Sequence, residues 1–156
     1  PSYLTIVARG DHGGYMEHVP DEHSPLLTRN ELLSRIRVTL AGRAAEIVYY
    51  GDEEGISTGA SGDLLQATKT ASAIICRYGM DQEFGLCTIE PTETPSQNIV
   101  MKINEILARE LNSAIEIVEK HRIEIDSLVT ELMKKNKLSE QEITQLLQHA
   151  TDDDQC

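Results

Sequence analysis

The sequence has very few aromatic residues. Its 156 residues include no tryptophan and one phenylalanine, and aromatic residues make up 4% of the chain. A core must therefore be built from leucine, isoleucine, valine and alanine, which suits helices packed on helices. The length allows one domain with its own core. The composition favours a mainly α-helical fold.

Basic residues are also scarce. Acidic residues outnumber lysine and arginine by 26 to 14, and the formal net charge is −12. A nucleic-acid partner needs basic side chains facing its phosphates, so the balance argues against nucleic acid. The acidity also argues against anionic lipid surfaces, and no apolar run approaches the roughly 20 residues of a membrane-spanning helix. We expect this chain by itself to be soluble.

Cysteines are few and irregularly spaced. Cys76, Cys87 and Cys156 are an odd number, and their spacing suggests neither a disulfide framework nor a thiolate zinc site. A reducing compartment is therefore expected. The chain begins at Pro1 without an initiator methionine or an apolar leader, so we expect it to be a fragment of a longer protein.

Motifs for zinc peptidases and nucleotide binding are missing. The sequence has no H-E-x-x-H, which would place two zinc ligands and a general base on one helix face, and no G-x-x-x-x-G-K-[ST] phosphate loop. The segment 18–23 resembles the inverted zinc motif, but it has one residue too many and contains a proline. We therefore predict no catalytic residue, no ATP site and no stoichiometric zinc in this chain. If zinc did bind, His12, His18 and His23 would be the first suspects.

The spacing of apolar residues and the positions of turn-forming residues predict the secondary structure. Residues 3–8 and 15–19 flank a glycine-rich turn and predict a hairpin, and a short strand is expected over 84–89. Apolar residues at spacings of three and four predict helices. One helix is expected between Thr28 and Gly51, and two more are expected over 63–78 and 96–121. The periodicity from Ile125 to Met133 predicts either a continuation of the last of these or a separate helix. A final helix is expected over 140–149.

Two capping boxes mark helix starts, Thr28 with Glu31 and Ser139 with Glu142. Gly42 lies within an expected helix, where glycine costs roughly 1 kcal/mol relative to alanine, so we expect another helix to pack closely there. The predicted fold is an irregular, mainly α domain with a small N-terminal β-hairpin. It spans residues 1–150, and 151–156 are expected to form a disordered acidic tail.

Four short motifs occur in a fixed order. They are Gly42-Arg43-Ala44-Ala45-Glu46, Thr58-Gly59-Ala60, Asp63-Leu64-Leu65-Gln66-Ala67-Thr68 and Tyr78-Gly79-Met80. In this order and at these spacings they resemble the C-terminal peptidase domain of the FtsH-type, membrane-anchored, ATP-dependent zinc metalloproteases. The most specific stretch runs from Leu32 to Gly79.

The resemblance implies roles for a few residues. Asp63 corresponds to the third zinc ligand, although spacing alone favours a helix N-cap at this position. Gly62 departs from the asparagine usual before this aspartate. Gly14 and Tyr15 correspond to the substrate-binding hairpin. The H-E-x-G-H helix would lie upstream of Tyr3, with the ATP-binding module and the membrane anchor further upstream.

The resemblance also implies a function for the parent protein. It would be a homo-hexameric zinc endopeptidase that degrades membrane and misfolded proteins, with this domain in the cytoplasm, an organelle matrix, the stroma or the intermembrane space. The fragment alone is expected to be inactive. Two alternatives are a non-catalytic helical module for oligomerisation and an adaptor that binds peptides at the hairpin edge. For Arg43 and Glu46, an ion pair that supports helix packing is favoured over a catalytic role.

Overall fold

A computed structural model describes residues 2–7, 15–17, 26–51, 55–89 and 95–153. The contacts divide the chain into two compact units, residues 25–120 and residues 1–24 together with 121–156. The described part contains six α-helices and a three-stranded sheet, which confirms the mainly α fold with a small hairpin. None of these helices is both long and apolar enough to cross a membrane.

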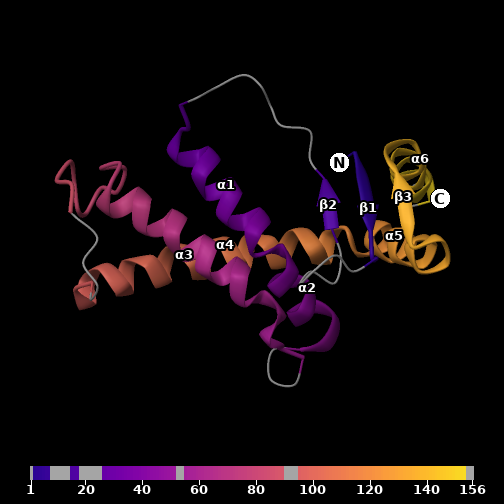
Figure 1. Cartoon of the computed structure of the whole chain (residues 1–156), viewed down its shortest axis with the longest axis horizontal. Helices are drawn as coiled ribbons and strands as arrows, with labels where there is room; N and C mark the ends of the chain where they lie inside the picture. Colours follow the sequence, from indigo (N-terminus) through magenta and orange to yellow (C-terminus); the bar gives the residue numbers. More distant parts are fainter. Residues whose placement is uncertain (1, 8–14, 18–25, 52–54, 90–94, 154–156) are drawn as a thin grey trace. The chain divides into compact units, whose positions relative to one another are not determined.

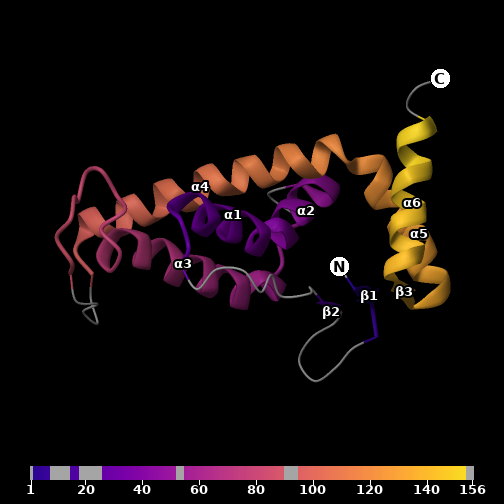
Figure 2. The same cartoon turned by 90° about the horizontal axis from the view of Figure 1, so that it is seen from above.

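Four α-helices form the unit of residues 25–120. They are α1 (Arg29–Thr39), α2 (Ala41–Tyr50), α3 (Ser61–Cys76) and α4 (Gln97–Lys120), and a short 3₁₀ turn η1 (Thr58–Ala60) leads into α3. The long helix α4 contacts the other three, and α1 also packs on α3 (Figures 1 and 2). The expected long helix over 96–121 is therefore confirmed.

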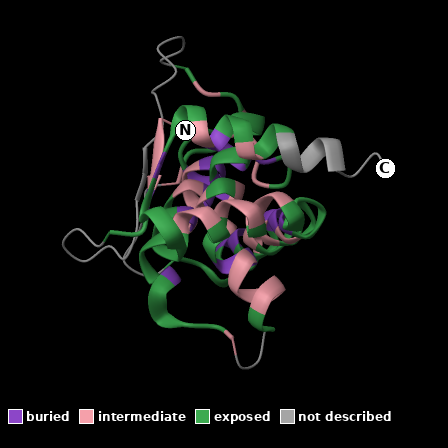
Figure 3. Ribbon diagram, turned by 90° about the vertical axis from the view of Figure 1, so that its right-hand side faces the viewer, coloured by how far each residue is buried: buried purple, intermediate pink, exposed green. Residues whose placement is uncertain are grey.

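Aliphatic and small side chains make the core between these helices (buried residues are purple in Figure 3). On α3 the fully buried positions Ala67 and Ala71 are small, which lets a neighbouring helix approach closely. One cluster of buried residues spans α1, α3 and α4: Leu32, Leu33, Ile36, Leu40, Ala67, Ala71, Ile74, Ile75, Cys76, Ile99, Ile103 and Ile106. The scarcity of aromatic residues is thus reflected in an aliphatic core.

An ion pair with a buried glutamate also joins α1 to α4. The side chain of Glu110 is 3% exposed, and its Oε2 lies 2.7 Å from Arg37 Nη2. Arg109 Nε donates to the other carboxylate oxygen at 3.0 Å. Both oxygens of this buried carboxylate are therefore satisfied, so loss of either arginine would leave buried charge less well paired.

The single helix predicted between Thr28 and Gly51 is wrong, because the chain bends at Leu40. Leu40 has ψ −3°, far from the helical value, although hydrogen bonds from Leu40 N to Ile36 O and from Ala44 N to Leu40 O span the bend. The Thr39 hydroxyl donates to the carbonyl of Arg35 at 2.8 Å. The same back-bonding by Thr68 and Thr70 leaves α3 unbroken, so the Thr39 hydrogen bond does not by itself explain the break between α1 and α2.

The chain turns at Gly79 after α3. The strand expected over 84–89 is wrong. Gly79 has φ +58°, and its left-handed conformation reverses the chain after α3 as glycine permits. Asp81 Oδ1 then accepts hydrogen bonds from the backbone N–H groups of Glu83 and Phe84. The turn occupies backbone groups that a strand would use for hydrogen bonds to a neighbouring strand. Asp81 and Gly85 are joined by an isolated β-bridge.

The second unit contains the small sheet. Strands β1 (Tyr3–Thr5), β2 (Tyr15–Glu17) and β3 (Lys137–Ser139) are antiparallel in the order β2-β1-β3. The predicted hairpin is confirmed, and the sequence did not predict its third strand. Leu4 of β1 pairs with Leu138 of β3, whose side chain is fully buried.

Two helices complete this unit, α5 (Arg122–Lys135) and α6 (Glu140–Asp153). His121 breaks the helical run, so α5 is a separate helix and not a continuation of α4. Asn136 adopts φ +61° and ends α5. Because α6 runs to Asp153, residues 151–153 of the expected tail are helical, and 154–156 lie outside the described residues. The domain boundary at residue 150 stays a prediction.

Candidate functional site

Asp63 lies at the third position of α3 and its side chain is exposed. The N-cap of α3 is Ala60, so the interpretation of Asp63 as an N-cap is wrong. The helix starts earlier than predicted because η1 feeds directly into it. Asp63 therefore caps no backbone amide from the N-cap position, and its carboxylate is available to solvent.

The carboxylate of Asp63 lies beside the start of α2. A Cβ atom added to Gly42 would be 3.9 Å from Asp63 Oδ2. Gly42 itself is exposed, so the close helix packing expected at this glycine is not seen among the described residues. The absence of a side chain at Gly42 instead leaves open space next to the carboxylate.

An ion pair on α2 faces the segment that precedes α3. Arg43 Nη1 lies 3.1 Å from Glu46 Oε2, and the two side chains are 10% and 22% exposed. Neither of these two buried atoms has another hydrogen-bond partner among the residues that the structure describes. The expected ion pair between Arg43 and Glu46 is thereby confirmed, and it lies within one helix.

Ser57 connects this ion pair to the start of α3. Arg43 Nη2 donates to the Ser57 carbonyl at 2.9 Å, and the Ser57 hydroxyl donates to Glu46 Oε1. The hydrogen bond from Ser57 lowers the pKa of Glu46 below its usual value, and the charge of Arg43 acts in the same direction. The hydroxyl of Ser57 also accepts the Gly59 N–H at 3.1 Å, as an N-cap of η1.

These contacts fix the backbone immediately before Asp63. The ion pair comes from the motif Gly42-Arg43-Ala44-Ala45-Glu46. Its arginine donates to the carbonyl of Ser57, which caps the Thr58-Gly59-Ala60 turn. The sequence analysis assigned Ser57 no role and so missed that it caps η1. The available signal was a serine directly before a Thr-Gly-Ala turn.

The described residues suit a metal ion only in part. A carboxylate oxygen such as that of Asp63 is a common zinc ligand, but a catalytic zinc site takes three protein ligands. Within the described ranges no group of three or more histidine, cysteine or acidic side chains could hold a metal. The described residues alone therefore do not form a zinc site.

The other candidate residues are placed only in part. Gly14 and the histidines His12, His18 and His23 lie outside the described residues. Tyr15 begins β2, where it pairs with Thr5 of β1 in the unit of residues 1–24 and 121–156. Its role in substrate binding stays a prediction.

Comparison with known proteins supports the family resemblance. The family model described as Peptidase family M41 matches residues 2–146. An ATP-dependent zinc metalloprotease FtsH 2 from Symbiobacterium thermophilum is 34% identical over 153 residues, covering 92% of this chain and 26% of that protein.

Two further relatives carry the printed name ATP-dependent zinc metalloprotease FtsH. The protein from Thermotoga maritima is 32% identical over 162 residues, covering 92% of this chain and 26% of its own length. That from Veillonella parvula is 39% identical over 131 residues, covering 84% of this chain and 19% of its own length. The chain thus spans about a quarter or less of these curated relatives.

Proposed function

Because this chain belongs to peptidase family M41, we propose that it forms the C-terminal part of an ATP-dependent zinc metalloendopeptidase. In this proposal Asp63 supplies the third protein ligand of the zinc, and an upstream H-E-x-x-H helix supplies the two histidines. The observation that carries the proposal is the exposed Asp63 carboxylate, which follows a segment held by Arg43, Glu46 and Ser57.

The local geometry supports a ligand role for Asp63. A metal ligand must be held in place by its surroundings, and the ion pair on α2 fixes the turn that leads into α3. The carboxylate lies in the first turn of α3, whose free N–H groups favour negative charge. Asp63 therefore has a fixed backbone, a carboxylate oxygen donor and open space on the side of Gly42.

The parent's wider properties follow from the family and belong to the same proposal. ATP is bound by a separate module, and the complete protein is a homo-hexamer that degrades membrane and misfolded proteins. The parent is anchored in a membrane, with this domain in the cytoplasm or in an organelle matrix, stroma or intermembrane space. Gly14 and Tyr15 of the hairpin contact the substrate.

Proteolysis by a longer form of the protein tests this proposal. In a protein that carries the upstream helix, Asp63→Asn should abolish ATP-dependent cleavage of an unfolded substrate such as casein, because the amide removes an anionic zinc ligand. ATP hydrolysis should remain. Glu119→Gln, a matched loss of one exposed carboxylate on α4, should leave proteolysis unchanged.

The other outcomes are equally informative. Full proteolysis by Asp63→Asn would overturn the ligand assignment. If the unsubstituted longer protein cleaves nothing, the non-catalytic oligomerisation or adaptor module replaces the protease in this account.

A further inference from the structure

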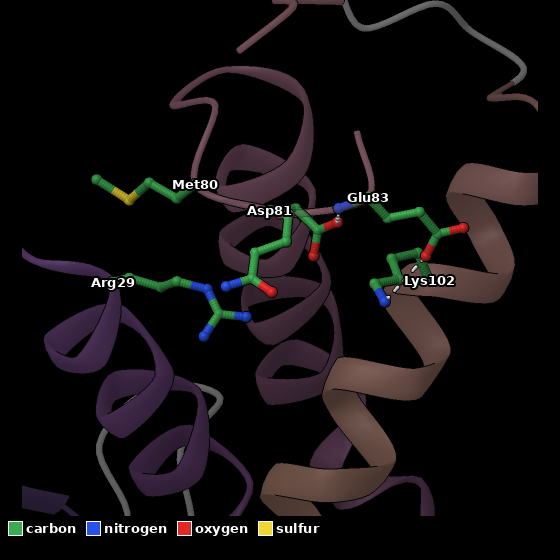
Figure 4. A pocket seen from close by; sticks show the side chains of 6 residues that line it. Arg29, Met80, Asp81, Glu83 and Lys102 are labelled. Carbon is green, nitrogen blue, oxygen red and sulfur yellow. Dashed lines mark hydrogen bonds and ion pairs between the residues drawn. The ribbon is translucent and has the colours of Figure 1, made fainter. Parts of the chain in front are cut away.

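A pocket of about 550 Å³ lies at the end of α3 opposite to Asp63. It is bounded by the start of α1, the turn after α3 and the first turns of α4. Its lining residues are Arg29, Met80, Asp81, Gln82, Glu83 and Lys102. Figure 4 shows Arg29 extending from α1 on one side and Lys102 from α4 on the other. All six residues belong to the unit of residues 25–120.

Arg29 carries the unexplained polar group of this pocket. Its Nε is buried and has no hydrogen-bond partner within the part of the chain that the structure describes. Among the described residues, no carboxylate forms an ion pair with its guanidinium. Buried polar groups are normally satisfied, and an arginine fork is suited to a carboxylate. Over the described ranges, the guanidinium therefore lacks the carboxylate partner that its geometry fits.

The other charged groups of the pocket already have partners. Lys102 Nζ lies 3.1 Å from Glu83 and 3.1 Å from Glu105. Asp81 is buried, and its Oδ1 accepts two backbone N–H groups in the turn after α3. Arg29 is thus the cation of the pocket that remains available to an added anion.

A smaller apolar hollow adjoins the pocket. It measures about 230 Å³ and is lined by Leu26, Leu27, Leu32, Tyr78 and Met80. Met80 lines both spaces, so a ligand with an acidic group at Arg29 can place an apolar group past Met80. Leu26 is 81% exposed, which leaves the hollow open to solvent at that residue.

We propose that these two adjoining spaces bind a carboxylate carried next to an apolar group, with the carboxylate on Arg29 and the apolar group against Met80. Such chemistry occurs at the end of a peptide chain and in a free branched carboxylic acid. The proposal is independent of the zinc site. Because Asp81 lowers the positive potential of the pocket, we expect a Kd on the order of 1 mM for a ligand of this size.

Methyl NMR of the whole 156-residue chain tests the proposal. The chain has four methionines, so ¹³C-methyl labelling gives a Met80 probe, assigned with Met80→Leu, and three internal references. N-acetyl-L-leucine should shift the Met80 signal saturably, whereas N-acetyl-L-leucinamide, which lacks the carboxylate, should not. Tighter binding of N-acetyl-L-leucine than of 4-methylvalerate assigns the site to a peptide end. Equal or tighter binding of 4-methylvalerate assigns it to a free acid.

Variants on α1 provide the controls. Arg29→Gln should weaken binding of N-acetyl-L-leucine by at least about tenfold, because the charged hydrogen bonds are lost. Arg35→Gln removes the same charge from an exposed position of α1 outside the pocket and should not change the affinity. Unchanged binding by Arg29→Gln, equal binding of acid and amide, or no saturable Met80 shift would each overturn the proposal. If Arg29→Gln fails to fold, the acid and amide titrations of the unsubstituted chain decide alone.

Discussion

At the scale of single residues, replacing Gly42 with alanine should make the folded chain more stable. It occupies the second position of α2, and a Cβ there would meet only Asp63 Oδ2, at ordinary van der Waals distance. Gly42→Ala should therefore raise the free energy of unfolding by about 0.5 to 1 kcal/mol through helix propensity. Urea unfolding of the two chains measures the difference.

Gly62→Ala provides the matched control for this substitution. Gly62 is also the second residue of a helix, α3, and a Cβ there would meet nothing within 4 Å. It should show the same gain, and any shortfall of Gly42→Ala relative to Gly62→Ala measures the contact with Asp63. A lower unfolding midpoint for both variants would contradict the helix assignments.

Single residues also show how far the sequence could predict the site. The ion pair of Arg43 with Glu46 follows from two opposite charges three residues apart on a helix. The role of Ser57 does not follow, because its partners on α2 become neighbours only after the chain has folded. The position of Asp63 within α3 depends on η1, whose three residues leave no periodic signal.

At the scale of elements, the capping box of α6 joins that helix to the sheet. Ser139 ends β3, and its backbone N–H and hydroxyl both donate to Glu142 Oε2, at 2.9 and 2.8 Å. Ser139→Ala should therefore destabilise the fold by about 1 kcal/mol, the usual scale for a lost N-cap. Thermal unfolding followed by circular dichroism checks this value, and an unchanged midpoint would show that the hydroxyl contributes nothing.

The same capping box should make α6 sensitive to acid. Lys135 Nζ donates to Glu142 Oε1 at 2.7 Å. This hydrogen bond, together with those from Ser139, lowers the pKa of Glu142 to about 2. Since the folded-state pKa lies below the unfolded value of about 4.3, the stabilisation is complete above that value and is lost as the pH falls towards 2. Glu142→Gln should therefore flatten the loss of thermal stability between pH 5 and pH 2.

The neighbouring Glu140→Gln is the control for this pH dependence. Glu140 is exposed in the same first turn of α6 but does not form the capping box. Its pH profile should follow that of the unsubstituted chain. A Glu142→Gln profile as steep as that of the unsubstituted chain would contradict the role given to Glu142.

Elements with strong local signals could be predicted, and those set by contacts could not. The capping boxes at Thr28 and Ser139 and the long apolar stripe of α4 locate helices directly from the sequence. The bend at Leu40 carries no proline or glycine, so periodicity continues through it. Strand β3 has three residues, and its pairing with β1 joins segments more than 130 residues apart.

At the scale of the whole molecule, the proposed function makes this chain one part of a zinc site. Residues 25–120 present Asp63 on a fixed backbone, and the relatives that match this chain are about four times longer or more. A zinc site with three protein ligands needs donors beyond the described residues.

Zinc content tests this account most directly. In a longer protein that carries the upstream H-E-x-x-H helix, we predict one zinc per chain by elemental analysis. Asp63→Asn should weaken zinc affinity by at least about tenfold, since changing even an outer partner of a ligand costs 10- to 100-fold. The 156-residue chain alone should hold less than one zinc per molecule. One tightly held zinc per chain in the Asp63→Asn protein, with unchanged affinity, would contradict the assignment of Asp63 as a ligand.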